Sequence, residues 1–189
     1  MQTIFSLISG ILCLIAYVPY ILNVIEGKTK PQRMSWFLWL VLSIISLVSQ
    51  ISLGATYSLV LSTVLTTGSL VIFLLSVKYG SGGIVSRDIW ALLLSFVGLI
   101  IWLTTDIPLI TLMINIVIGS VGALLTIQKT IEHPGSETAI TWLLASVAGI
   151  ASLFSLSIGN LRFGLIAYPI YIIVTNFAMY VASRTHKKL

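Results

Sequence analysis

The chain alternates between long apolar runs and short polar breaks over almost its whole length. Seven apolar runs can be delimited, at residues 4–25, 34–53, 57–77, 89–105, 107–127, 138–158 and 163–183. Each run has about 17–22 residues, and at about 1.5 Å per residue a helix of this length crosses a hydrocarbon core of about 30 Å. A helix satisfies its own backbone hydrogen bonds in lipid, whereas an open sheet does not. The pattern therefore predicts an all-α integral membrane protein with seven transmembrane helices.

The composition strengthens this prediction and excludes several other classes of protein. The 189 residues are 58% hydrophobic and 8% charged, with a mean hydropathy of +1.10. A soluble domain is about 45–50% apolar and about 25% charged, so this chain has too few charges to coat a soluble globule. The net charge of +5 is spread over the loops instead of forming one basic face, which argues against a nucleic-acid partner. The single cysteine, Cys13, excludes an intramolecular disulfide and a cysteine-rich metal site.

The cations predict how the chain is oriented in the membrane. On one side of the predicted bundle lie Lys28, Lys30, Arg33, Lys78, Arg87, Lys129, Arg184, Lys187 and Lys188, and on the other side lies Arg162. Positive charge accumulates on the cytoplasmic side of membrane proteins. We therefore expect an external N-terminus and a cytoplasmic C-terminus. The first run lacks a basic segment before it and is longer than a signal peptide core, which favours a retained span. The short loops favour a prokaryotic inner (plasma) membrane.

Part of the chain is repeated. At a shift of 106 residues, ten of the 29 pairs between residues 21–49 and 127–155 are identical, including Trp36 on Trp142 and Glu26 on Glu132. Chance in so apolar a composition would give about three identities, and shared composition is the alternative explanation.

The repeat divides the chain into three parts. Residues 1–79 form a first three-helix repeat, 80–106 a linker with the fourth helix, and 107–189 a second three-helix repeat. Because one odd helix separates the repeats, both have the same orientation, around an axis along the membrane normal. Transporters with parallel repeats hold their substrate in a cavity on that axis, so a solute site is expected there.

This 3+1+3 plan resembles the SWEET / PQ-loop (MtN3-like) family of seven-helix transporters, of which the chain would be a divergent prokaryotic member. In that family the first helix of each repeat ends in Pro-Gln, and a loop with Lys-Ser or Lys-Thr follows. Pro19-Tyr20 occupies the place of this dipeptide, and Lys28-Thr29 follows it; in the second repeat Leu125-Thr126 stands at the matching place, with Gln128 nearby. The resemblance implies a facilitated uniporter of a small, sugar-like solute, without a cofactor. Relatives of this architecture often associate, which leaves a homo-oligomer open.

Polar residues at helical spacing predict where the solute would bind. One stripe consists of Trp39, Ser43, Ser46 and Gln50, a second of Ser58, Ser62, Thr66 and Ser69, and Ser152 belongs to a reduced stripe in the second repeat. Carboxamides such as Asn115 and Asn176 suit the hydroxyl groups of a solute. The family resemblance places an asparagine of the third helix of each repeat at the substrate, and Asn176 fits that place. The predicted substrate-binding residues are Asn176, Asn115, Gln50, Ser46, Ser69 and Ser152. The alternative is that these polar groups only help membrane helices to pack.

Prolines and aromatic residues near the predicted helix ends are candidates for gating. Pro19 and Pro169 interrupt apolar runs, and a proline inside a helix permits a kink or a hinge. Tyr17, beside Pro19, could close the inner gate. Trp36 and Trp142 begin predicted helices at the membrane interface, where an aromatic belt is the favoured interpretation and a gating role the alternative.

The residues that the predicted spans lack narrow the mechanism. We find no Asp, Glu, Lys, Arg or His in the middle of any predicted span, which favours passive uniport over proton coupling. No phosphate loop, metal quartet or nucleophile–base arrangement is present in the sequence, so an enzyme is not expected. The predicted partners are a small-molecule solute and the lipid bilayer. The alternatives are a non-transporting PQ-loop-like receptor or scaffold and a lipid-handling protein.

Overall fold

The apolar runs fold as a bundle of long helices. The computed structural model describes residues 2–52, 59–82, 108–155 and 163–185, with scattered positions between 89 and 104. Its helices are α1 (Gln2–Ile25), α2 (Arg33–Ser52), α3 (Leu59–Tyr79), α5 (Pro108–Glu132), α6 (Ala139–Phe154) and α7 (Phe163–Thr185). The described residues thus form six helices, where the sequence predicts seven. Of the predicted fourth span, 89–105, nine scattered residues are described and are helical, but no continuous helix is delimited there. Helix α5 continues five residues beyond its predicted end at 127.

The helices have the length and the surface of membrane spans. Four of them, α1, α3, α5 and α7, are long and apolar enough to cross a membrane, and the described parts of α2 and α6 are shorter apolar helices. Large apolar side chains such as Leu74, Leu124 and Val174 are more than half exposed on the outer faces of the bundle. Lipid replaces the water that such side chains would avoid. These features of the described residues are those of a helical membrane protein.

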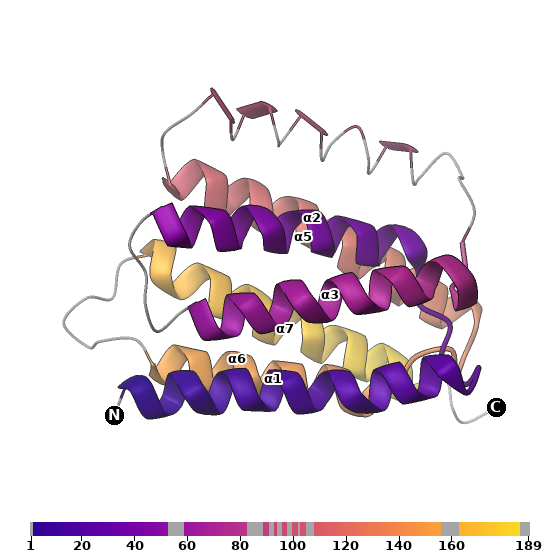
Figure 1. The fold of residues 1–189 in the computed structure, drawn as a ribbon. Helices are drawn as coiled ribbons and strands as arrows, with labels where there is room; N and C mark the ends of the chain where they lie inside the picture. Colours follow the sequence, from indigo (N-terminus) through magenta and orange to yellow (C-terminus); the bar gives the residue numbers. More distant parts are fainter. Residues whose placement is uncertain are drawn as a thin grey trace.

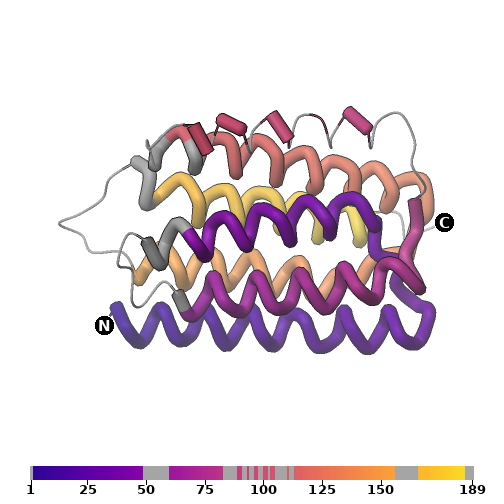
Figure 2. The backbone as a smooth tube through the Cα atoms, turned by 45° about the horizontal axis from the view of Figure 1, so that its top comes forward, coloured from indigo at the N-terminus to yellow at the C-terminus, as the bar shows by residue number. Residues whose placement is uncertain are grey.

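The six helices form two groups of three with equivalent neighbours. In Figures 1 and 2, α1, α3, α5 and α7 run in one direction along the bundle and α2 and α6 return in the other. Helix α1 packs against α3 and α6, while α5 packs against α7 and α2, and the remaining pairs are α2 with α3 and α6 with α7. A shift of 106 residues converts each of these pairings into another one. We call α1–α3 the first unit and α5–α7 the second unit.

The two units meet where α1 packs on α6 and where α2 packs on α5. On one side, Ser9 Oγ donates a hydrogen bond of 2.9 Å to the carbonyl of Ala148. On the other, Trp39 Nε1 donates one of 3.1 Å to the carbonyl of Gly119. Gly122 permits this approach, because a Cβ at that position would lie 2.9 Å from Trp39 Nε1. The small residues of α5 therefore bring the tryptophan of α2 against the backbone of the other unit.

One end of the bundle carries the loops 26–32, 80–82 and 133–138, and we call it the basic end. Gly27 and Gly135 have positive φ angles of 72° and 80°, and they turn the chain after α1 and α5. The first loop is fixed to the end of α3, since Arg33 N donates to the carbonyl of Ser81 at 3.1 Å and Ser81 N to that of Pro31 at 2.9 Å. The loop 26–32 is therefore held in a defined position against the end of α3.

Candidate functional site

A cavity of about 110 Å³ lies between the two units and is lined by residues of all six helices. Its lining includes six pairs of residues related by the 106-residue shift: Trp36 and Trp142, Trp39 and Ala145, Leu42 and Ala148, Ser43 and Gly149, Leu65 and Tyr171, and Ser69 and Thr175. A single water needs about 10–15 Å³ of such volume. The cavity therefore has room for several waters or a small ligand, on the axis that relates the units.

Four of the predicted substrate-binding residues line this cavity. Asn115, Asn176, Ser46 and Ser69 reach it from α5, α7, α2 and α3 respectively. Asn176 Nδ2 donates a hydrogen bond of 2.8 Å to the carbonyl of Ile172 within its own helix. These four residues lie on four different helices, so the bundle brings together groups that are far apart in the chain.

The other two predicted substrate-binding residues, Ser152 and Gln50, are not among the described residues that line the cavity. Ser152 is half-buried in α6 and is not among the lining residues. Gln50 belongs to α2, but its side chain lies outside the described residues.

Thr141 lines the cavity and was missed by sequence reasoning. It is buried, and its hydroxyl group has no hydrogen-bond partner in the structure. Leaving a buried polar group without a partner costs about 1–3 kcal/mol. A threonine at the start of a helix is typical of helix capping, so its sequence position alone does not indicate a binding role. The 106-residue shift pairs it with Ser35, whose buried hydroxyl also has no partner.

Five aromatic side chains gather between the cavity and the basic end, and we call them the aromatic plug: Tyr17, Tyr20, Trp36, Trp39 and Trp142. The indole rings of the repeat-related Trp36 and Trp142 stack with centroids 6.0 Å apart. The ring centroid of Tyr20 is 5.1 Å from that of Trp36 and 5.6 Å from that of Trp142. The centroids of Trp39 and Trp36 are 5.0 Å apart. Rings in tilted, edge and offset contact attract one another beyond the effect of burial. The plug thus joins α1, α2 and α6.

The interpretation of Trp36 and Trp142 as lipid-belt anchors is wrong. Their side chains are 3% and 4% exposed, and they face each other across the axis between the units. A tryptophan at a helix start has the same sequence signature whether the helix turns it toward lipid or toward the bundle.

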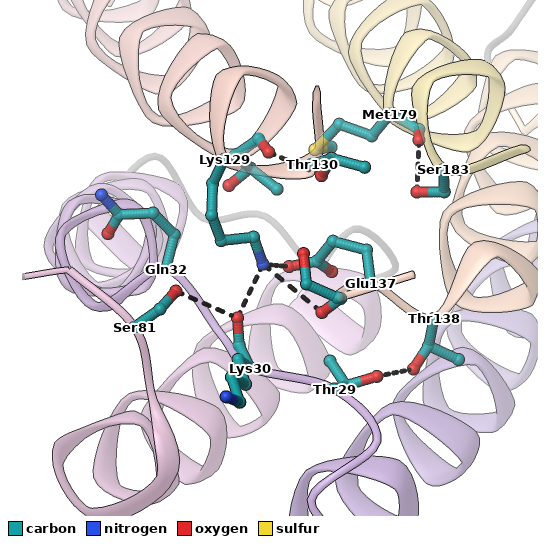
Figure 3. Close-up of polar contacts among 12 residues, drawn as sticks. Thr29, Lys30, Gln32, Ser81, Lys129, Thr130, Glu137, Thr138, Met179 and Ser183 are labelled. Carbon is teal, nitrogen blue, oxygen red and sulfur yellow. Dashed lines mark hydrogen bonds and ion pairs between the residues drawn. The ribbon is translucent and has the colours of Figure 1, made fainter. Parts of the chain in front are cut away.

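A buried carboxylate, that of Glu137 (Figure 3), accepts hydrogen bonds from Tyr20 and Trp142 of the plug. Glu137, in the loop before α6, forms an ion pair with Lys129 of α5, and both side chains are almost fully buried. Trp142 Nε1 donates a hydrogen bond of 3.1 Å to Oε2 of Glu137, and Tyr20 donates one of 3.2 Å to Oε1. Burial raises the pKa of the Glu137 carboxyl, while the Lys129 ammonium opposes this shift. The carboxylate is therefore surrounded by donors from three helices.

Sequence reasoning placed Lys129 among the cations of the cytoplasmic side and gave Glu137 no role. The apolar run of α5 ends near residue 127, which places Lys129 in a loop, whereas the helix continues to Glu132 and carries Lys129 in its last turn. Glu137 stands among small polar residues and gives no periodic signal. The available clue is that this carboxylate precedes Trp142 by five positions, which places both residues near the N-terminal end of α6.

Of the predicted gating residues, Tyr17 lines the cavity, and the two prolines are next in sequence to Tyr20 of the plug and to the lining residue Tyr168. Pro19 and Pro169 lie inside α1 and α7. Tyr17 lines the cavity, and its hydroxyl donates a hydrogen bond of 3.4 Å to the carbonyl of Leu65. Its ring lies against Gly68, where an added Cβ would be 2.3 Å from the ring. The role of the two prolines as hinges stays a prediction.

Comparisons with protein-family models, with characterised proteins and with solved structures give no match for this chain. In the described part of the chain, no three His, Cys, Asp or Glu side chains are close enough to hold a metal ion. The features of this chain that bear on its function are therefore the cavity and the contacts that cover it.

Proposed function

We propose that the chain is a membrane carrier that moves a small polar solute down its gradient by alternating access. The observation that carries this proposal is the cavity between two equivalent three-helix units, lined by two carboxamides, several hydroxyl groups and aromatic rings. A cavity on the axis between parallel repeats is the substrate position in transporters built in this way.

The chemistry of the cavity favours an uncharged solute. Among its described lining residues, none has a charged side chain. A charged solute would lose its hydration there without gaining an opposite charge, at a cost of several kcal/mol. Aromatic faces with amide and hydroxyl groups suit a neutral molecule that has both apolar faces and hydroxyls. The resemblance to SWEET / PQ-loop carriers points in the same direction, toward a sugar-like solute and uniport.

The positions of the plug and the prolines support a rocking mechanism. The plug lies between the cavity, which Trp36 and Trp142 line, and the basic end, where Tyr20 contacts Glu137. We assign the basic end to the cytoplasmic side and take the plug as its closed gate. In this proposal, the units rotate against each other, and Pro19 and Pro169 permit their helices to bend because each removes one backbone hydrogen bond. Opening of the basic end would then expose the cavity to the cytoplasm.

Binding of the solute is expected to change the fluorescence of the purified protein, because Trp36, Trp39 and Trp142 line the cavity. A panel of neutral sugars and polyols titrated in detergent should include one that gives saturable quenching. Asn176→Leu removes a hydrogen-bonding group of the cavity and should weaken that binding at least tenfold, the equivalent of one buried hydrogen bond.

Ser152→Ala is the control, because Ser152 is not among the lining residues, and its affinity should equal that of the wild type. Equal affinity in Asn176→Leu would contradict the assignment of Asn176. A folded protein that binds no neutral solute would favour the receptor or lipid-handling alternatives.

A further inference from the structure

We infer that Glu137 and Lys129 form a charged latch that holds the basic end closed between the two units. The inference deepens the proposed function, because it names the contacts that a carrier must break to release solute on this side. It is carried by the geometry around one buried ion pair, which Figure 3 shows together with the loops that it joins.

The latch consists of hydrogen bonds that cross from one unit to the other. The ammonium of Lys129, in the second unit, donates a bond of 2.6 Å to the carbonyl of Lys30 in the loop of the first unit. The carboxylate of Glu137, also in the second unit, accepts the bond from Tyr20 of α1. Beside them, the loops are joined directly, since Lys30 N donates to the carbonyl of Ser136 at 3.0 Å. Hydrogen bonds to charged groups are the strongest of this set.

The repeat-related partner of Lys129 makes the reciprocal contact. Lys129 corresponds to Asn23 at the shift of 106 residues. Asn23 Nδ2 donates a bond of 3.0 Å to Thr138 Oγ1 in the loop of the second unit, and Thr138 shares a bond of 2.6 Å with Thr29. Each unit therefore uses the last part of its first helix to bind the loop of the other unit. In the second unit this position carries a charge, which makes its contact the stronger one.

Glu137 also holds the aromatic plug in place. Trp36 Nε1 donates a bond of 3.0 Å to the hydroxyl of Tyr20, and Tyr20 in turn donates to Glu137. Trp142 donates to the other carboxylate oxygen. A single carboxylate thus fixes, directly or through Tyr20, three of the five plug residues, which come from both units. Loss of this acceptor would free the plug as well as the loops.

Opening leaves the ion pair intact and breaks only the contacts between the units. Lys129 and Glu137 both belong to the second unit, so they can stay together when the units separate. The hydrogen bonds to Tyr20 and to the Lys30 carbonyl cross between the units, so they must break when the units separate. Water that enters the open end would then solvate the pair, so neither charge is left buried without a partner. This arrangement suits a contact that must form and break in each cycle.

The test measures how fast a reagent labels the thiol of Cys13, the one cysteine of the chain. Cys13 lines the cavity and is buried. An impermeant methanethiosulfonate reagent is added to inside-out membrane vesicles, and labelling of Lys28→Cys in a Cys13→Ser background establishes that the basic end faces the reagent. The double variant Lys129→Met/Glu137→Gln and the single variant Tyr20→Phe are each expected to label Cys13 about tenfold faster than the wild type, the equivalent of one hydrogen bond to a charged group.

The exposed ion pair between Glu26 and Lys28 at the same end provides a matched control. Glu26→Gln/Lys28→Met removes the same two charges and is expected to label at the wild-type rate. Wild-type rates in both latch variants, from folded protein, would overturn the inference, and so would equally fast labelling of the control. Tyr20→Phe decides the matter if the double variant does not fold, since it keeps the ring and both charges. The labelling assay needs no solute, so it tests the latch independently of the proposed function. If the latch variants label faster but the protein binds no solute, the carrier proposal is refuted and the latch is supported.

Discussion

Oxidation of a Thr29→Cys/Thr138→Cys variant, made in a Cys13→Ser background, is expected to stop solute flux almost completely, and reduction is expected to restore it. The hydroxyl oxygens of Thr29 and Thr138 are 2.6 Å apart, across the contact between the two loops. Sulfur atoms at these positions need only a small shift to reach the disulfide length of about 2.05 Å. The covalent bond would hold the units together at the basic end, so the cavity could not open there.

The measurement is uptake into vesicles before oxidation, after oxidation and after treatment with dithiothreitol. Each single cysteine variant serves as a control and should keep its flux under the oxidant. A fully oxidised double variant that carries solute at the reduced rate would show that this end does not open during transport.

Removal of one charge of the latch pair is expected to be far more harmful to folding than removal of both. Lys129→Met leaves the buried carboxylate of Glu137 without its counter-charge, and breaking a buried pair in this way costs about 3–5 kcal/mol. For a chain of this size the midpoint of thermal unfolding should fall by on the order of 10 °C. Adding Glu137→Gln should recover most of this loss, because an amide needs no counter-charge.

Thermal unfolding of the detergent-purified variants, followed by the fraction that stays monodisperse, measures this effect. Lys28→Met is the matched single-charge control, because the Lys28 side chain is 69% exposed and solvent screens its ion pair. A double variant that is no more stable than Lys129→Met would mean that Lys129 acts through packing and not through its charge.

The helices could be predicted well because the membrane restricts what an apolar run can do. Their lengths follow from the thickness of the bilayer, so the runs 4–25 and 163–183 correspond closely to α1 and α7. Polar groups such as Asn115 and Asn176 could also be placed inside the bundle, because lipid disfavours them. Helical spacing then put Ser46 and Ser69 on inward faces, and both line the cavity.

The contacts that close the cavity could not be predicted in the same way. The side of a helix on which Trp142 lies depends on which neighbour packs there, and a single helix does not contain that information. The burial of Lys129 depends on a loop that is 99 residues away and supplies the Lys30 carbonyl. A count of charges per side treats every cation as solvated, so it cannot separate an exposed lysine from a buried one.

The most direct test of the carrier is counterflow of labelled neutral solutes, sugars first, in liposomes that contain the purified protein. We predict saturable flux that a pH gradient does not change, because no charged side chain is among the described lining residues of the cavity. A flux that requires the pH gradient would contradict uniport. The absence of flux for every solute, from protein shown to be folded, would contradict the carrier itself.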